Sequence, residues 1–473
     1  MISKSDIHDR MKRQDINPSL DAIREVTKSL GSPQNTFVSI RITGTNGKTS
    51  TAYMIDALLR AEDQSCGLFI SPGLYNPDGD IFVDGEMQAC GSLEARSTAL
   101  CETEHHLQIE LTSYEALTIK SILAFKDAAV DFAVIESGLG ATWDATGIVN
   151  PAVAVVTGIG LDHCDFLGKT IEEIATNKSH IIVPGSSVIL GESTQNTIDI
   201  FLQRAASFNL HPRQVNADSY HIVETTPFST IFDVMTTHEH YCDLKLAAPA
   251  YQASNAATAI FAAEAVLGRA LDSDKVRSAL AHTTFPGRLE VIRKDPLLIF
   301  DGSHNPAAAH ILAELIGDIT QAVTDGAKPV IALGILADKD AEGIIKALAP
   351  VAADFIAIEP PNERAIPAAE LAKLIEGVAG KPPIAIIEGA AVGEGGGCSA
   401  NSAIEGQGIN LDIRYEDCAE YPSPDMRRTG MDTLRQILNT TGRQPVIVTG
   451  SLSLYPLLQS IRLSDSDDVV GVT

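Results

Sequence analysis

The chain of 473 residues carries 61 acidic and 35 basic side chains, which gives a formal net charge of −26 at pH 7. This charge disfavours non-specific binding to nucleic acid or anionic lipid, because those partners are themselves negative. No apolar run is long enough to cross a membrane, and the N-terminus is too polar for a signal peptide. We therefore expect a cytoplasmic protein of two or three domains, with no nucleic-acid or membrane partner.

Strand-like apolar runs alternate with helix-like segments in the first part of the chain. The predicted strands are 37–42, 132–136 and 152–157, and the predicted helices are 50–60, 114–125 and 171–177. This alternation is typical of a parallel sheet flanked by helices. Segment 194–245 is mixed in character, and 251–267 is predicted to be a long Ala-rich helix.

A second alternating series begins near Leu297. Its predicted strands are 297–300, 330–334, 354–358 and 445–449, and its predicted helices are 306–316, 341–348 and 367–375. Two of these helices open on proline, which suits the first helical position. The pattern predicts a second α/β domain beyond a hinge at Pro286 and Gly287, and hence domains 1–287 and 288–473. The Gly-rich segment 389–424 is interpreted as a flexible loop or insertion.

The seven cysteines are scattered and form no Cys-x-x-Cys pair. This pattern argues against a disulfide framework or a zinc ribbon. Reduced thiols are the expectation.

The stretch Thr-Gly-Thr-Asn-Gly-Lys-Thr, residues 43–49, lies between a predicted strand and a predicted helix. Such a turn aims backbone N–H groups and the positive helix end at phosphate oxygens. Lys48 would add a point charge, and Thr49 a hydroxyl for a magnesium ion. The first glycine of the usual motif is missing, since Ile42 occupies its position. An ordinary strand-to-helix turn is the alternative, but the flanking elements favour a phosphate loop.

Charged side chains follow the next two predicted strands. Glu136 ends one strand, and Asp162 and His163 follow the other. Ligand crevices of open α/β sheets form at the carboxyl ends of strands. The two positions together therefore favour a metal or phosphate site over solvated surface groups. Lys178, by composition and spacing alone, is interpreted as a surface lysine.

Asp301 and His304 lie between a predicted strand and a predicted helix of the second domain. In one interpretation Asp301 forms a turn and Asn305 caps the helix. In the other, Asp301 and His304 face across a domain cleft toward Lys48. The residues alone leave both interpretations open.

Several short motifs follow one another along the chain. They are, in order, Gly44-Thr-Asn-Gly-Lys-Thr, Ser71-Pro, Tyr114-Glu-Ala-Leu-Thr, Glu136-x-Gly-Leu-Gly, Asp144-Ala-Thr, Asp162-His, Pro286-Gly-Arg and Asp301-Gly-Ser-His-Asn-Pro. Taken together, these motifs resemble those of the folylpolyglutamate synthases, a branch of the Mur ligase superfamily that includes dihydrofolate synthases. The resemblance covers nearly the whole chain. It implies a Mur-ligase-like α/β fold, in which a P-loop ATPase domain with a parallel sheet precedes a smaller C-terminal Rossmann-like domain.

The resemblance also implies a reaction. Enzymes of this family use ATP and Mg²⁺ to convert a carboxylate into an acyl phosphate, which the amine of an amino acid then attacks. The implied substrates are small molecules, namely ATP, L-glutamate, and a folate or dihydropteroate. A monomer with two magnesium sites is expected.

Site residues are carried over by motif, and these roles are implied by the resemblance. The ATP-binding residues are Gly44, Thr45, Asn46, Gly47, Lys48, Thr49, Asn255, Arg288 and Asp301. The metal-binding residues are Thr49, Ser71, Glu136, His163 and Lys178, and the family commonly carbamylates this lysine. The substrate-binding residues are Glu115, Ser71 and His304. The catalytic residues are Lys48, Glu136, His163, Lys178, Asp301 and His304.

Three departures from the family pattern keep other hypotheses open. Ala141 replaces the second glycine of a Gly-Gly pair, Gly147 replaces an asparagine, and Ser179-His180 replaces Ala-Gly. A weakened ATP-binding or regulatory homologue is therefore one alternative. A cell-wall Mur ligase is disfavoured, because only about 40 residues precede the phosphate loop, too few for a further domain.

Overall fold

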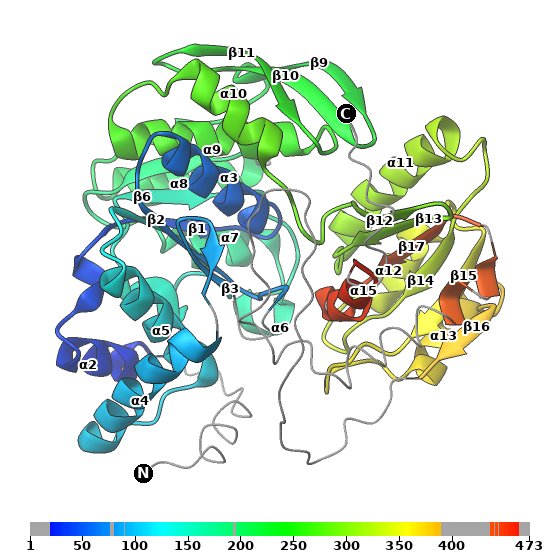
Figure 1. The fold of residues 1–473 in the computed structure, drawn as a ribbon, viewed down its shortest axis with the longest axis horizontal. Coiled ribbons are helices and arrows are strands. Elements are labelled where there is room, and N and C mark those ends of the chain that lie inside the picture. The colour runs from blue at the N-terminus through cyan, green and yellow to red at the C-terminus, as the bar shows by residue number, and fades with distance from the viewer. Residues whose placement is uncertain are drawn as a thin grey trace. The chain divides into compact units, whose positions relative to one another are not determined.

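The computed structural model describes residues 19–75, 80–88, 90–192, 195–388, 436–438, 440–442 and 444–462 (Figure 1). The chain divides into two compact units, Met1–Thr284 and Phe285–Thr473. The Gly-rich segment 389–424 lies outside the described residues. Among the residues described, no helix has the length and apolar character to cross a membrane.

Unit 1 is built on an eight-stranded sheet in the order β4-β3-β2-β5-β1-β6-β7-β8. From β2 to β8 neighbouring strands are parallel, whereas β3 and β4 add an antiparallel edge. The predicted parallel sheet is therefore confirmed at its centre. The strands are β1 (Val38–Thr43), β2 (Cys66–Ile70), β3 (Asp80–Val83), β4 (Glu86–Met87), β5 (Phe132–Glu136), β6 (Val153–Val156), β7 (Ser187–Leu190) and β8 (Arg213–Gln214).

Local sequence signals explain where helices of unit 1 begin. A capping box of Thr112 and Glu115 starts α5, and one of Thr170 and Glu173 starts α7. Apolar side chains of α2 and α5 and of α7 and α8 fill two separate hydrophobic clusters. The helices of this part are α2 (Asp21–Ser29), α3 (Lys48–Ala61), α4 (Cys90–Leu107), α5 (Ser113–Asp127), α6 (Cys164–Leu167), α7 (Ile171–Ser179) and α8 (Gln195–Ala206).

A second, three-stranded antiparallel sheet completes unit 1 (Figure 1). It consists of β9 (Tyr220–Thr226), β10 (Ser229–Met235) and β11 (His240–Leu246). Burial alternates along β10, so one face of this sheet packs against α9 (Gln252–Leu267) and α10 (Ser273–His282). The segment described from sequence as mixed thus contains α8 and most of this sheet.

Unit 2 contains a six-stranded sheet in the order β12-β13-β17-β14-β15-β16. Only the pair β12–β13 is antiparallel among these strands. The strands are β12 (Glu290–Lys294), β13 (Leu297–Asp301), β14 (Val330–Leu333), β15 (Asp354–Ile358), β16 (Ala385–Ile387) and β17 (Val446–Thr449). The helices described are α11 (Pro306–Ala322), α12 (Ala341–Leu348), α13 (Ala368–Ala379) and α15 (Tyr455–Arg462).

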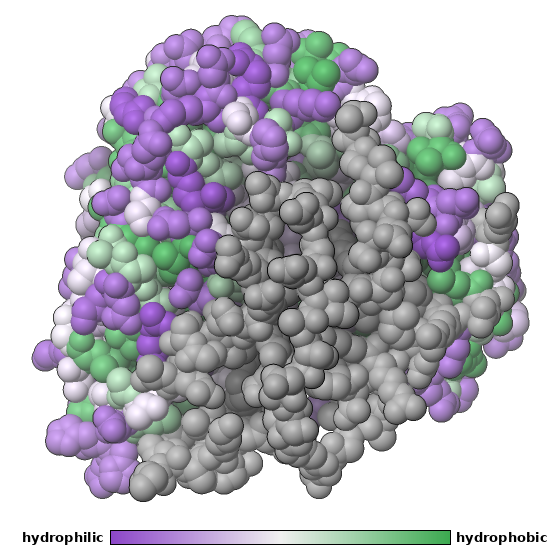
Figure 2. All heavy atoms as spheres, in the orientation of Figure 1, coloured by the Kyte–Doolittle hydropathy of each residue, from purple (hydrophilic) through white to green (hydrophobic). Residues whose placement is uncertain are grey.

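The two prolines that were predicted to open helices occupy different positions at α11 and α13. Pro306 is the first residue of α11, as predicted. Pro367 is instead the N-cap residue of α13, so the expectation that this helix opens on proline is wrong by one position. Among the coloured residues in Figure 2, hydrophilic side chains surround smaller apolar patches.

Candidate active site

Four neighbouring parallel strands of unit 1, β2, β5, β1 and β6, end at the same edge of the sheet. Ile42 of β1 pairs in register with Glu136 of β5, and Thr43 pairs with Val156 of β6. The segments that follow these strands therefore lie side by side. The loop 44–47 leaves the sheet between the end of β5 and the end of β6, where ligand crevices of such sheets form.

Two glycines give this loop its shape. Gly47 has a φ of 86°, and a Cβ atom there would lie 2.5 Å from Oδ1 of Asn255. A Cβ atom on Gly44 would overlap the side chain of Thr157. Only glycine fits such close approaches. Helix α9 thereby brings Asn255 against the loop, although some 200 residues separate them in sequence.

The amides of Thr45 and Asn46 in the loop are hydrogen-bonded within the protein. Thr45 and Asn46 donate their N–H groups to the Gly158 carbonyl, at 2.7 and 3.4 Å. Lys48 Nζ donates to the carbonyls of Gly44 and Thr45, at 3.1 Å each. The N–H groups of Thr45 and Asn46 thus face the Gly158 carbonyl, and phosphate binding by the loop stays a prediction. The positive terminus of α3 and Lys48 remain the groups suited to an anion.

A hydroxyl and a carboxylate meet beside the loop. Thr49 Oγ1 donates to Glu136 Oε1 at 3.1 Å, and Glu136 is only 1% exposed. Ser71, also buried, follows β2, the next strand beyond β5. Hydroxyl and carboxylate oxygens are the hard ligands that Mg²⁺ prefers, so Thr49 and Glu136 fit a magnesium site.

Lys178 is not a surface residue, so the interpretation from composition and spacing is wrong. Its side chain is 5% exposed, and Nζ donates to the Gly44 carbonyl at 2.7 Å. Burial, and then the charge of Lys48, lower the pKa of Lys178 from 10.5 to about 7. Three carboxylates oppose this shift, those of Asp162, Asp144 and Glu136.

The Asp162–His163 pair lies between β6 and α6. The His163 N–H group donates to Asp162 Oδ1 at 2.9 Å, and His163 Nε2 lies 3.8 Å from Asp162 Oδ2. Asp162 is buried, and its charge raises the pKa of Lys178. His163 is half-buried. Both residues belong to the metal or phosphate site predicted from their position after a strand, and the family resemblance implies a metal-binding role for His163.

Tyr114 begins the motif Tyr114-Glu-Ala-Leu-Thr but was not among the predicted site residues. Its hydroxyl accepts a hydrogen bond from the Gly138 N–H group at 2.9 Å, and a Cβ atom on Gly138 would lie 2.8 Å from that hydroxyl. Glu115, the residue predicted to bind substrate, accepts hydrogen bonds from the N–H and the hydroxyl of Thr112, at 2.9 Å each. Its buried carboxylate caps α5, so the contacts described for Glu115 are structural.

Two of the departures from the family pattern, Ala141 and His180, lie where the segment after β5 contacts the end of α7. The amide of Ala141 donates to Asn177 Oδ1 at 3.1 Å, and the Thr142 hydroxyl donates to the Asn177 carbonyl at 3.2 Å. The same hydroxyl lies 2.6 Å from Nδ1 of His180. The segment after β5 is thus fastened to the end of α7, which carries Lys178. At the third departure, a Cβ atom on Gly147 would lie 2.9 Å from Leu20.

In unit 2, Asp301 organises the end of β13. Its Oδ2 accepts from the N–H of Leu289 at 2.8 Å, and its Oδ1 accepts from the N–H of Ser303 at 2.9 Å and from the Ser303 hydroxyl. Asp301 is 5% exposed. The turn-forming interpretation of Asp301 is confirmed, and its role toward nucleotide stays a prediction.

Asn305 and His304, which follow Asp301 in sequence, are also held by hydrogen bonds to the backbone. Asn305 Oδ1 accepts from the N–H of Ala308 at 2.9 Å, which confirms Asn305 as the N-cap of α11. His304 Nδ1 lies 2.8 Å from the Gly302 carbonyl, so Nδ1 carries a proton and donates. A Cβ atom on Gly302 would lie 2.9 Å from the guanidinium of Arg288. Arg288, Asp301 and His304 therefore gather at one end of the unit 2 sheet.

The fold and the cluster at the strand ends define a ligase of the Mur type: residues 42–263 match the Mur ligase middle domain, and residues 287–392 match the Mur ligase glutamate ligase domain. The chain is 34% identical over 382 residues to the dihydrofolate synthase/folylpolyglutamate synthase of Mycobacterium tuberculosis, covering 76% of this chain and 77% of that protein. It therefore belongs to the dihydrofolate synthase/folylpolyglutamate synthase family, and the resemblance found in its motifs is confirmed.

Two further comparisons agree with this assignment. The dihydrofolate synthase/folylpolyglutamate synthase of Bacillus subtilis is 30% identical over 364 residues, covering 74% of this chain and 83% of that protein. A solved structure of Mycobacterium tuberculosis folylpolyglutamate synthase complexed with ADP superposes with a TM-score of 0.79 at 27% identity, covering 97% of both chains.

Proposed function

We propose that this chain is an ATP-dependent ligase that joins L-glutamate to the carboxylate of a folate, and that it also accepts dihydropteroate. The observation that carries this proposal is the hydrogen bond between Thr49 and Glu136, at 3.1 Å. The pair lies beside the loop whose Gly44 carbonyl accepts a hydrogen bond from the buried Lys178. This pair brings a hydroxyl and a carboxylate together beside the N-terminus of α3. A nucleoside triphosphate and its metal ion require such groups.

In the proposed reaction the substrate carboxylate attacks the γ-phosphorus of ATP, and ADP leaves. Lys48 turns from its two loop carbonyls toward the outer phosphates and offsets their charge. The amine of glutamate then attacks the acyl carbon, and phosphate leaves as the amide forms. Water is the competing nucleophile, so the enclosure of both reactants raises the yield of amide.

Thr49, Ser71 and Glu136 would hold one magnesium ion, and His163 and Lys178 a second. Bound magnesium supplies charge neutralisation between two anions that have to approach one another. An ammonium group repels a cation, so we include carbamylation of Lys178, which gives it anionic oxygens. The burial of Lys178 and its pKa of about 7 support this modification, because the neutral amine is the form that reacts with carbon dioxide.

In unit 2 we assign Arg288 and Asp301 to the nucleotide and His304 to the glutamate. Their gathering at the end of β13 supports these roles. The imidazole of His304 donates through Nδ1 to Gly302, so its tautomer leaves Nε2 as the acceptor in the neutral form. We also propose a monomeric, cytoplasmic enzyme without nucleic-acid or membrane partners.

The test is a ligation assay with ATP, magnesium and glutamate, with dihydropteroate in one reaction and tetrahydrofolate in another. Product mass spectra should show one added glutamate on dihydropteroate and one or more on tetrahydrofolate. Lys48→Ala should abolish both products, whereas Lys126→Ala, which removes an exposed lysine at the end of α5, should retain them. No product in either reaction, with ATP still bound, would favour the weakened regulatory homologue.

A further inference from the structure

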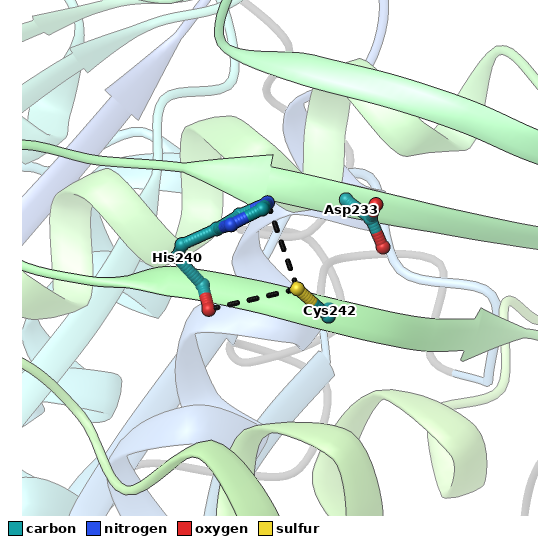
Figure 3. Close-up of side chains that lie close together, drawn as sticks. All are labelled: Asp233, His240 and Cys242. Carbon is teal, nitrogen blue, oxygen red and sulfur yellow. Dashed lines mark hydrogen bonds between the residues drawn. The ribbon is translucent and has the colours of Figure 1, made fainter.

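The sheet β9–β11 carries three potential metal ligands outside the proposed active site, namely Asp233, His240 and Cys242 (Figure 3). His240 and Cys242 are two residues apart on β11, so their side chains project from the same face. The intervening Tyr241 is fully buried on the other face, and so is Phe232 beside Asp233. The three side chains therefore lie on the solvent side of the sheet.

An irregularity in the pairing of β10 with β11 brings Asp233 to the other two residues. The register shifts between Phe232 and Val234, so Cys242 and Asp243 together lie opposite Asp233. Asp243 has a φ of 56°, and its N–H group donates to Asp233 Oδ1 at 2.9 Å. Bulges of this kind redirect a side chain, and a hydrogen bond to a carboxylate oxygen fixes the orientation of a metal ligand.

The separations of the three ligand atoms suit one ion. One atom from each side chain lies within 4.8 Å of the others, and Cys242 Sγ lies 3.6 Å from His240 Nε2. Zinc–sulfur and zinc–nitrogen bonds of about 2.3 and 2.1 Å at a tetrahedral angle put the two ligand atoms about 3.6 Å apart. Sulfur and nitrogen thus already have the spacing of two ligands on one zinc ion.

We propose that Asp233, His240 and Cys242 bind a divalent transition-metal ion of the zinc class, with water in the fourth position. A thiolate and an imidazole select such ions over Mg²⁺, which takes oxygen ligands. The thiol proton passes to solvent as the sulfur–metal bond forms. The ion connects β10 to β11, so it stabilises the sheet that covers α9 and α10.

Cobalt is the probe, because Co²⁺ coordinated by a thiolate gives a near-ultraviolet charge-transfer band. Titration of the full-length reduced protein with Co²⁺ should produce this band, and zinc should abolish it by competition while excess Mg²⁺ should not. Cys242→Ser should lack the band. The matched control is Cys164→Ser, which removes an exposed cysteine next to the predicted magnesium ligand His163 and should keep it. A band that survives in Cys242→Ser, or no band in the wild type, overturns the proposal.

Zinc affinity gives a second, independent measurement. His240→Ala and Asp233→Asn should each weaken zinc binding by at least about 10-fold, the loss typical of even an outer partner of a metal site. His211→Ala removes an exposed histidine outside this cluster and should bind as the wild type does. Zinc should also raise the melting temperature of the wild type and not that of Cys242→Ser. Unchanged zinc affinity in both His240→Ala and Asp233→Asn overturns the proposal.

Discussion

Lys178 shows how burial sets the charge of one residue and ties it to pH. The fall in pKa from 10.5 to about 7 corresponds to about 5 kcal/mol that opposes protonation in the folded state. Between these pH values the unfolded chain binds more protons, so this lysine makes stability rise as pH rises from about 7 to 10. Lys178→Met should remove that rise.

The measurement is urea unfolding without magnesium or bicarbonate. At pH 6 the variant should be more stable than the wild type by about 2 kcal/mol or more, after the loss of the hydrogen bond to Gly44 at about 1–3 kcal/mol. The advantage should disappear near pH 10. Lys126→Met, at an exposed position, should leave the pH dependence unchanged. A stability difference of Lys178→Met that is the same at every pH contradicts the assigned burial of charge.

The contact between Thr142 and His180 gives a second prediction for single residues. The Thr142 hydroxyl donates to Asn177 O, so His180 Nδ1–H donates to that hydroxyl at 2.6 Å. Thr142→Val should cost about 1 kcal/mol of stability, and so should His180→Ala. A double-mutant cycle should give a coupling of about 0.5–1.5 kcal/mol, since both changes remove the same bond. Strictly additive losses would mean that the two residues do not interact in solution.

The start of helix α11 is set by its N-cap residue. Asn305 accepts the N–H of Ala308, and Pro306 follows it at the first helical position. Asn305→Ala should lower the stability of unit 2 by about 1 kcal/mol, whereas Asn305→Asp should retain the cap. Denaturant unfolding of both variants tests this. Equal losses in the two variants would assign the effect to something other than the side-chain acceptor.

Elements with a strong local pattern were predictable from sequence, and those that depend on distant partners were less so. The strand β5 and the helix α12 have the predicted bounds, because a continuous apolar run and an amphipathic repeat identify them. The sheet β9–β11 was missed, although Ser229–Met235 alternates buried and partly exposed residues as a strand should. The sheet β9–β11 packs against α9 and α10, and this packing partner is not visible in a local sequence pattern.

The same limit applies to the candidate site. Lys48, Glu136 and His163 were predictable because they lie at or shortly after the ends of predicted strands. The burial of Lys178 could not be read locally, because it arises where α7 meets the Gly44 carbonyl, 134 positions away in sequence. Tyr114 is a similar case, since its contact with Gly138 exists only once the start of α5 lies against the segment that follows β5.

At the scale of the whole molecule, a chain of net charge −26 is expected to bind a polyanion at one place. The charge of Lys48 lowers the pKa of Lys178, so Lys178 is a weaker cation than an ordinary lysine. In the proposed function, the N-terminus of α3, Lys48 and the proposed magnesium offset this global repulsion of ATP locally. Binding should weaken strongly when magnesium is withheld.

Thermal unfolding tests this balance and the contribution of each unit. With MgATP at about 100 times its dissociation constant, the bound state gains about 2.7 kcal/mol, which raises the melting temperature of a unit of this size by several degrees. Lys48→Ala should remove most of that shift, while Lys126→Ala should keep it.

Arg288→Ala examines the second unit in the same experiment. Arg288 is half-buried, and its guanidinium lies beside Gly302 at the end of β13, so its truncation should leave the melting temperature without nucleotide nearly unchanged. If Arg288 contacts ATP as proposed, the nucleotide-induced shift should fall clearly below that of the wild type, because the variant lacks one contact with the bound nucleotide. A full shift in Arg288→Ala, together with a lost shift in Lys48→Ala, would assign nucleotide binding to unit 1 alone.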